Sequence, residues 1–221
     1  LCTLFVMAII PALVVIEDLG TAIAIAGALV CMMIVAEVPW RYLGVCMGLG
    51  LAGIAAMIAV KPYRLKRITA FLDPFADPLR TGYQVVQSLY ALGSGWLFGV
   101  GLGASRQKLL YLPERHTDFI FSIIGEELGF VGAAFVILLF AMFIWRGFYI
   151  AAHLEDKFKS LTAFGLTAVI GIQAMINIGV AVGAMPVTGI TLPFISYGGT
   201  SLSFMLATVG FLLNLSRYMK H

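Results

Sequence analysis

Charged residues are scarce in this sequence. Asp, Glu, Lys and Arg make up 11% of the 221 residues, and the formal net charge is only +3. Hydrophobic residues make up 61%, and the mean hydropathy is +1.01. This composition excludes an ordinary soluble domain and is typical of a multi-span membrane protein. The small net charge gives no reason to expect nucleic acid as a partner.

Cysteine is also rare, and the start of the chain has no leader pattern. The three cysteines, Cys2, Cys31 and Cys46, lie in apolar runs without metal-ligand spacing, so we expect buried free thiols. The sequence begins at Leu1 inside an apolar run, with no initiator Met and no basic segment. We therefore expect a fragment that lacks its N-terminal part, and not a signal peptide.

Long apolar runs dominate what is present, and a membrane span needs ~20 such residues. The runs cover residues 1–16, 19–36, 41–60, 118–145, 161–183 and 200–217. The sequence therefore predicts an all-α membrane protein, a polytopic bundle of about six transmembrane helices with the first truncated. No internal repeat or linker divides the chain, so 1–221 is expected to form one domain.

The polar breaks between these runs are short except for 61–117, which we expect to form a long functional loop. Its start is amphipathic and is broken by two Asp-Pro pairs. Its Gly-rich part, 83–103, could lie in the interface, dip into the membrane or span it. If 83–103 does not span, eight Lys/Arg fall on the loop side and six opposite; if it spans, the split is ten and four. Charge counting alone favours the span.

Acidic residues at the fourth long run are the main candidates for chemistry. Asp118 lies where water meets the apolar run, and it could be a helix N-cap, a general base, or both. Glu126 and Glu127 follow about two turns further in, where an acid is costly and must face protein, water or a partner. Buried hydrogen bonding is the simpler role for these two, and support of catalysis is the alternative.

Further polar elements are predicted on the same membrane side as Asp118. Asp18 is expected in a turn between two helices. Gly99, Gly101 and Gly103 are expected to allow close helix or lipid approach, because no strand precedes them as a dinucleotide site requires. Cations near Asp118 could contact lipid headgroups or clamp a diphosphate. The loop 185–200 is rigid and could donate hydrogen bonds from Ser, Tyr and Gly-Gly groups.

Several of these stretches resemble one family. They are RITAFLDPFADP, GYQVVQSLYALGSG, GLGASRQKLLYLPERHTDFIFSIIGEELGF, TLPFISYGGTS and DLGTA, collinear over nearly the whole chain. They resemble the SEDS family (shape, elongation, division and sporulation), and GYQ–QSL and SRQK are closer to its FtsW cell-division branch or sporulation relative than to its RodA branch.

The resemblance implies the last six of ten spans in a bacterial cytoplasmic (inner) membrane protein, with the long loop extracytoplasmic and its Gly-rich part not spanning. It implies a peptidoglycan glycosyltransferase that polymerises lipid II, with Asp118 as the essential acid. It also implies a class B penicillin-binding transpeptidase and other division or sporulation membrane proteins as partners. The alternatives are a lipid II flippase or other transporter, and a non-catalytic scaffold for the transpeptidase.

The site assignment that follows has three groups. Asp118 is the catalytic base, and Asp18, Glu126 and Glu127 are supporting acids. Substrate contacts are assigned to Arg106, Lys108, Glu114, Arg115, His116, Ser196, Tyr197, Gly198 and Gly199. Diphosphate is a good leaving group, so one carboxylate can suffice for catalysis. The negative charge of the leaving diphosphate must then be stabilised, either by Arg106, Lys108 and Arg115 or by a divalent cation, Mg²⁺ or Mn²⁺.

Overall fold

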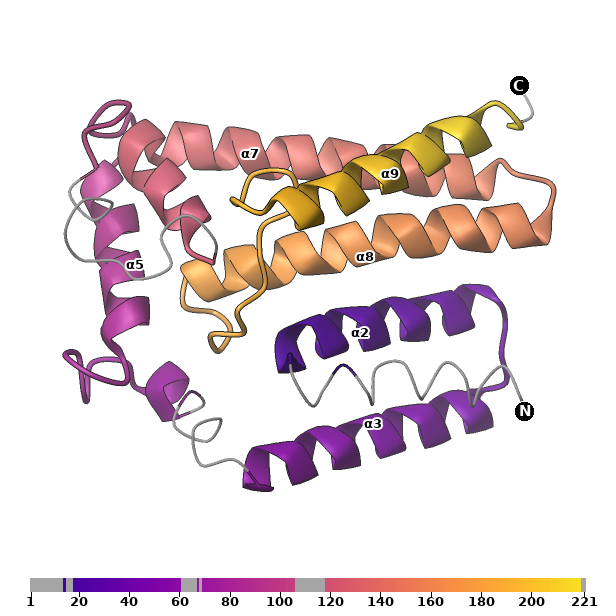
Figure 1. Ribbon diagram of the computed structural model, residues 1–221, viewed down its shortest axis with the longest axis horizontal. Coiled ribbons are helices and arrows are strands. Elements are labelled where there is room, and N and C mark those ends of the chain that lie inside the picture. The colour runs from indigo at the N-terminus through magenta and orange to yellow at the C-terminus, as the bar shows by residue number, and fades with distance from the viewer. Residues whose placement is uncertain (1–13, 15–17, 61–66, 68, 106–117, 220–221) are drawn as a thin grey trace. The chain divides into compact units, whose positions relative to one another are not determined.

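The computed structural model describes residues 14, 18–60, 67, 69–105 and 118–219, and every regular element within these ranges is an α-helix (Figure 1). The elements are α2 (Leu19–Val35), α3 (Trp40–Val60), α5 (Tyr83–Gly95), α7 (Ile120–Ala152), α8 (Lys157–Ala181) and α9 (Gly199–Ser216). By length and composition α7, α8 and α9 can cross a membrane, and α2 is a shorter apolar helix. Five predicted runs are thus helices, and the predicted first span lies outside the described residues.

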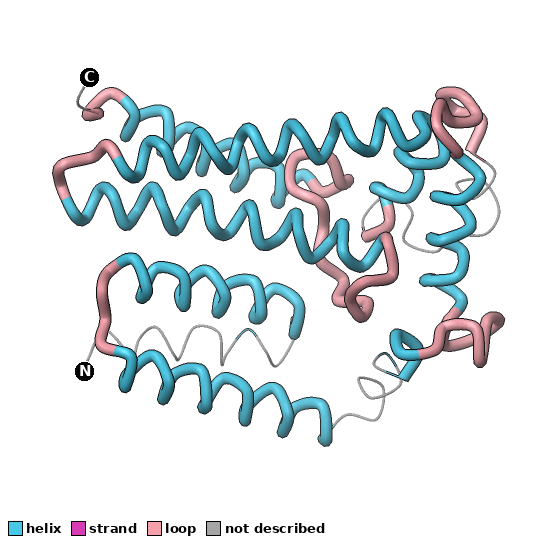
Figure 2. Tube along the Cα trace, turned by 180° about the vertical axis from the view of Figure 1, so that it is seen from behind, coloured by secondary structure: helices cyan, strands magenta, loops and turns pink. Residues whose placement is uncertain are grey.

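The Gly-rich part of the long loop does not form a spanning helix. Its helix α5 has 13 residues, which is about 20 Å and shorter than the ~30 Å hydrocarbon core. After α5 the chain turns through residues 96–103 in non-helical conformations, visible as a loop in Figure 2. The seven-span count favoured by charge is therefore wrong, because a short helix followed by glycines does not cross the bilayer.

The described chain forms two compact units. The first contains α2, α3 and α9 with residues 142–173, and the second contains residues 61–141 and 174–199. In the first unit, α2 and α8 approach closely at glycines: an added Cβ at Gly165 would lie 2.5 Å from Met32 Sδ. Small residues at such contacts are common in membrane helices. A single domain over 1–221 stays a prediction.

In the second unit, α5 is fixed to α7 and α8 by a buried serine. Ser88 Oγ donates to the Ala181 carbonyl at 2.6 Å and lies 2.5 Å from Ser122 Oγ. Close packing adds to this, since an added Cβ at Gly95 would lie 1.9 Å from the Gly125 carbonyl oxygen. Both serines are fully buried, so their hydroxyl groups need these partners.

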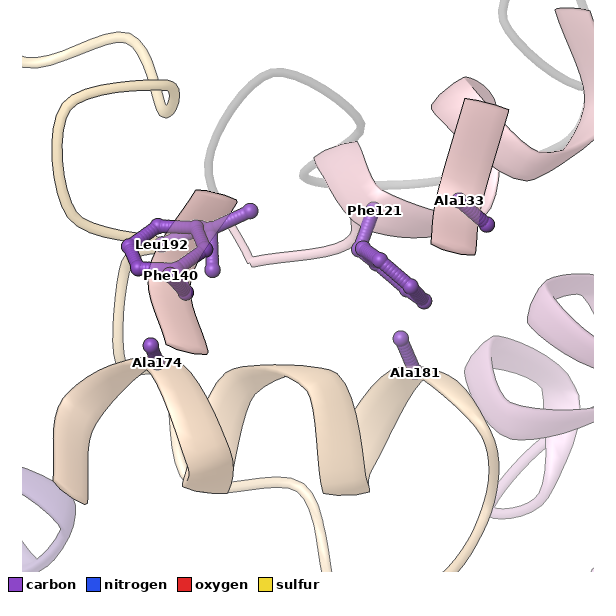
Figure 3. Packing of buried hydrophobic residues seen from close by; sticks show 6 residues of the cluster. All are labelled: Phe121, Ala133, Phe140, Ala174, Ala181 and Leu192. Carbon is purple, nitrogen blue, oxygen red and sulfur yellow. The ribbon is translucent and has the colours of Figure 1, made fainter. Parts of the chain in front are cut away.

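An apolar cluster forms the core of the second unit (Figure 3). Side chains from α7 and the loop before α9 gather over the face of α8 that carries two alanines. The members are Phe121, Ala133, Phe140, Ala174, Ala181 and Leu192. The small alanines let the aromatic rings approach the α8 backbone, and the cluster joins the start of α7 to the loop before α9.

Helix α7 is broken at Gly129, which has φ +69° and ψ −168°. A break in a membrane helix frees main-chain groups that lipid cannot pair. Here the segment after α5 pairs them. Val100 N donates to the Glu126 carbonyl at 3.0 Å and Phe130 N donates to the Trp96 carbonyl at 2.7 Å. The first turns of α7 consequently run at an angle to the rest (Figure 1).

Glycine is required where these two backbones meet. An added Cβ at Gly99, φ +78°, would lie 2.2 Å from the Glu127 carbonyl oxygen, and one at Gly129 would lie 2.4 Å from Gly99 N. No side chain fits at either position without moving main chain. The predicted close approach to a helix is confirmed for Gly99 alone, because an added Cβ at Gly101 or Gly103 would meet nothing within 4 Å.

We expect Gly129→Ala to destabilise the protein by about 1–3 kcal/mol, because the side chain adds left-handed strain and a backbone clash. Gly93→Ala is the matched control: it lies inside α5 with nothing within 4 Å of an added Cβ. It should be neutral or stabilising by about 0.5–1 kcal/mol, as Ala is the better helix former. Thermal unfolding in detergent distinguishes the two. A Gly129→Ala midpoint equal to wild type would contradict this account of the break.

Candidate functional site

Asp118 lies two residues before the start of α7 and is partly buried. Its carboxylate faces the backbone of the loop between α8 and α9: an added Cβ at Gly189 would lie 3.7 Å from Asp118 Oδ2. Gly189 has φ +82°, a conformation that favours glycine. The absence of a side chain at 189 keeps space beside the carboxylate. The N-cap role for Asp118 stays a prediction.

Asn177, near the end of α8, connects Asp118 to that loop. Its side-chain Nδ2 donates to the Asp118 carbonyl at 2.8 Å and to the Ile190 carbonyl at 2.7 Å. The residue is 1% exposed. Three chain segments, the start of α7, the end of α8 and the loop, are therefore held together at the candidate catalytic residue.

The loop from 182 to 198 is closed by its own hydrogen bonds. Ser196 Oγ accepts from Leu192 N at 2.7 Å, and Ser196 N donates to the Leu192 carbonyl at 3.0 Å. Leu192 and Pro193 are buried, whereas Tyr197 is 81% exposed. The Ser196 hydroxyl thus stabilises the turn between Leu192 and Ser196. The exposed Tyr197 comes directly after this turn, and Gly198 and Gly199 follow Tyr197. Their predicted contacts with substrate stay predictions.

A cation of the long loop also contacts this loop. Arg67 Nη1 donates to the Val187 carbonyl at 3.1 Å, two residues before Gly189. The guanidinium therefore lies beside the loop segment that faces Asp118. Five predicted substrate residues, Arg106, Lys108, Glu114, Arg115 and His116, lie outside the described residues.

The supporting acids have separate roles in the structure. Glu126 is 2% exposed, and its carboxylate accepts a hydrogen bond from the fully buried Ser105. Glu126 was predicted to form a buried hydrogen bond to a neighbouring helix; the bond is buried, but its partner lies in the non-helical chain after α5. Glu127 is partly buried at the break in α7. Asp18 caps α2 through bonds from Gly20 N and Thr21 N at 2.9 and 3.2 Å.

Within the described ranges, no three His, Cys, Asp or Glu side chains come together to hold a metal ion. Mg²⁺ is usually held by one or two carboxylates together with substrate phosphates and water. The described residues therefore do not supply a metal centre of their own. A divalent cation at this site stays a prediction.

Two residues of the site were not singled out by sequence reasoning. Asn177 is one of two amides, with Gln173, in an apolar stretch, and the cost of burying an amide in a span was a usable signal. Arg67 is one of four cations at the start of the long loop, and nothing in the pattern distinguished it from Lys61, Arg64 or Lys66. Both residues are identified as part of the site only by their hydrogen bonds to main-chain carbonyls that are distant in sequence.

Fold and site together define a polytopic helical membrane protein with one partly buried carboxylate at the start of a spanning helix. The chain belongs to the FtsW/RodA/SpoVE family, described as cell cycle proteins, whose model matches residues 1–221. The predicted relationship to the SEDS family is confirmed.

Individual relatives support the FtsW-like or sporulation branch. The chain is 53% identical over 205 residues to stage V sporulation protein E of Bacillus subtilis (strain 168), covering 92% of this chain and 56% of the relative. It is 44% identical over 207 residues to a probable peptidoglycan glycosyltransferase FtsW of Geobacter sp. (strain M18), covering 92% and 56%. The chain thus spans just over half the length of these relatives.

A solved structure shares the fold. The chain superposes with a TM-score of 0.76 and 33% identity on a chain of a structure described as "Structural coordination of polymerization and crosslinking by a peptidoglycan synthase complex". The match covers 96% of this chain and 60% of that one. The fold class predicted from the sequence, a helical membrane protein, is confirmed.

We expect Ser105→Ala to lower stability by about 1–3 kcal/mol, because it removes a donor to the buried Glu126 carboxylate. Ser94→Ala is the matched control, since Ser94 Oγ donates only within its own helix, to the Ala91 carbonyl at 2.9 Å. Thermal unfolding midpoints of both variants in detergent test this. Equal midpoints for the two variants would show that the Ser105–Glu126 bond contributes little.

Proposed function

We propose that the protein containing this chain is a peptidoglycan glycosyltransferase that polymerises lipid II, with Asp118 as general base. The observation that supports it is the Asp118 carboxylate, whose main chain is held at the start of a spanning helix by Asn177 and which faces Gly189. Membership of a family with relatives named as probable peptidoglycan glycosyltransferases gives the reaction class. The reaction then belongs to cell division or sporulation.

The reaction follows from the chemistry of the two substrates. The acceptor sugar hydroxyl attacks the anomeric carbon of a polyprenyl-diphosphate-linked donor and forms the new glycosidic bond. Its proton passes to the Asp118 carboxylate, and the electron pair of the breaking C–O bond leaves with the diphosphate. A positioned base of this kind contributes ~10²–10⁴ in rate. Direct displacement inverts the anomeric centre.

Negative charge grows on the diphosphate as it leaves, so cations are needed nearby. Arg67 is the cation that the structure ties to the loop beside Asp118, through the Val187 carbonyl. We assign it a share of this stabilisation, together with Arg106, Lys108 and Arg115. A guanidinium suits phosphate oxygens because its donors form a planar fork.

Localisation and partners follow from the same proposal. The protein is a multi-pass protein of the bacterial cytoplasmic membrane, with Asp118 on the extracytoplasmic face, where lipid II is polymerised. The matching solved structure is described as a synthase complex that coordinates polymerisation with crosslinking. This supports a class B transpeptidase as partner, alongside other division or sporulation membrane proteins.

The competing functions are a lipid II flippase and a non-catalytic scaffold. Buried acids suit a transport path as well as an enzyme. In the structure, however, Glu126 bonds to Ser105 and Asp18 caps α2. These acids have structural partners, which favours the enzyme.

We expect Asp118→Asn in the full-length protein to reduce glycan polymerisation at least 100-fold, because the amide does not accept the proton. Purified protein with lipid II in detergent, analysed by gel for polymer, measures this. Asp156→Asn is the matched control: Asp156 is exposed, and its carboxylate accepts from Phe158 N at 2.8 Å, a bond that Asn can retain.

Formation of polymer by the wild-type protein in detergent would also distinguish an enzyme from a flippase, because a detergent micelle has no second side to which lipid II could be moved. Lipid II movement across vesicles without polymer would overturn the proposal in favour of a transporter. Retained polymerisation by Asp118→Asn would remove Asp118 from the base role. Unchanged co-purification with the transpeptidase shows that the variant is folded.

We expect Arg67→Met to slow polymerisation at least tenfold, because one cation near the leaving diphosphate is lost. Arg80→Met is the matched control, since Arg80 is exposed in the same long loop. Initial rates at saturating lipid II compare the two variants. Equal rates in both would show that Arg67 does not act on the diphosphate.

A further inference from the structure

We infer that Asn177 is a positioning residue for the Asp118 carboxylate, acting through two main-chain carbonyls. This inference rests on the proposed function of Asp118. The hydrogen bonds of Asn177 Nδ2 end on the backbone of Asp118 and on the backbone of Ile190. The residue therefore acts on the chain that carries the carboxylate.

The chemistry of the contact explains why the residue is an amide. Both partners are carbonyl oxygens, which only accept, so the side chain must present two donors from one atom. The NH₂ group of Asn does this, whereas a hydroxyl has one donor and an ionised carboxylate has none. The same chemistry fixes which end of the amide faces the carbonyls, because an oxygen there would meet two acceptors.

The other end of the amide shows that this arrangement has a cost. Asn177 Oδ1 is buried and has no hydrogen-bond partner among the described residues. An unpaired buried acceptor destabilises the folded state, because it has lost its hydrogen bonds to water. A leucine would avoid that cost but would leave both carbonyls without their donor. A positional role for the NH₂ group accounts for keeping the amide in an apolar stretch.

The two carbonyls are those that set the geometry of the candidate base. One belongs to Asp118, so its bond fixes the main chain from which the carboxylate projects. The other belongs to Ile190, next to Gly189, the residue that faces Asp118 Oδ2. Asn177 therefore fixes both the carboxylate and the backbone it faces. Misplacing a catalytic group by about 1 Å can cost ~10²-fold in rate.

Two variants test the inference in the full-length protein. Asn177→Leu removes both donors, and Asn177→Asp keeps the size of the side chain while replacing the amide by a carboxyl group. We expect each to lower kcat for lipid II polymerisation about 100-fold while KM changes less than about threefold, because substrate contacts remain. Thr167→Val is the matched control: Thr167 is fully buried in the same helix, and its hydroxyl bonds to the Ala163 carbonyl of that helix. It should keep wild-type kcat.

Hydrogen exchange supplies a readout that needs no activity. In Asn177→Leu and Asn177→Asp, exchange should become faster in peptides covering 118–123 and 186–192 and stay unchanged in α2 and α9. Faster exchange throughout both units, or wild-type kcat in either variant, would overturn the inference. If Asp118→Asn stays active while the local exchange still changes, the proposed function fails and the structural contact stands.

Discussion

The need to pair every main-chain polar group inside a membrane protein governs this structure. Lipid offers no hydrogen bonds, so a broken helix or an irregular loop at membrane depth must find its partners within the protein. Two places meet this need. At the break in α7, the Gly-rich segment pairs the carbonyls and amides around Gly129. Beside Asp118, the Asn177 amide pairs two carbonyls of non-helical chain.

The same requirement explains why some polar side chains are buried where chain segments meet. Ser88, Ser105 and Asn177 are buried, and each forms a hydrogen bond with a residue outside its own turn of the chain. These bonds join α5, the loops and the ends of α7 and α8. Buried polar residues therefore determine which segments meet, while the apolar cluster around Phe121 and Leu192 fills the space between them.

Much of the fold could be predicted from sequence, because apolar length alone identifies spanning helices. The runs that contain α7 and α8 were evident, and the motif around Asp118 identified the family. Charge counting failed for the Gly-rich part of the loop, since it does not register that α5 is short and ends in glycines. The site was predicted only in part. Asn177 and Arg67 act on carbonyls 59 and 120 residues distant in sequence, and sequence patterns do not record such contacts.

The break at Gly129 also divides α7 into a short first part and a longer second part. A straight helix of 33 residues would be about 50 Å long, well beyond a hydrocarbon core of ~30 Å. From Phe130 to Ala152 the helix measures about 35 Å, which matches that thickness with a modest tilt. The turns before the break, which begin two residues after Asp118, are not needed to span that thickness. The direction of these first turns, next to the candidate base, can therefore differ from that of the spanning part.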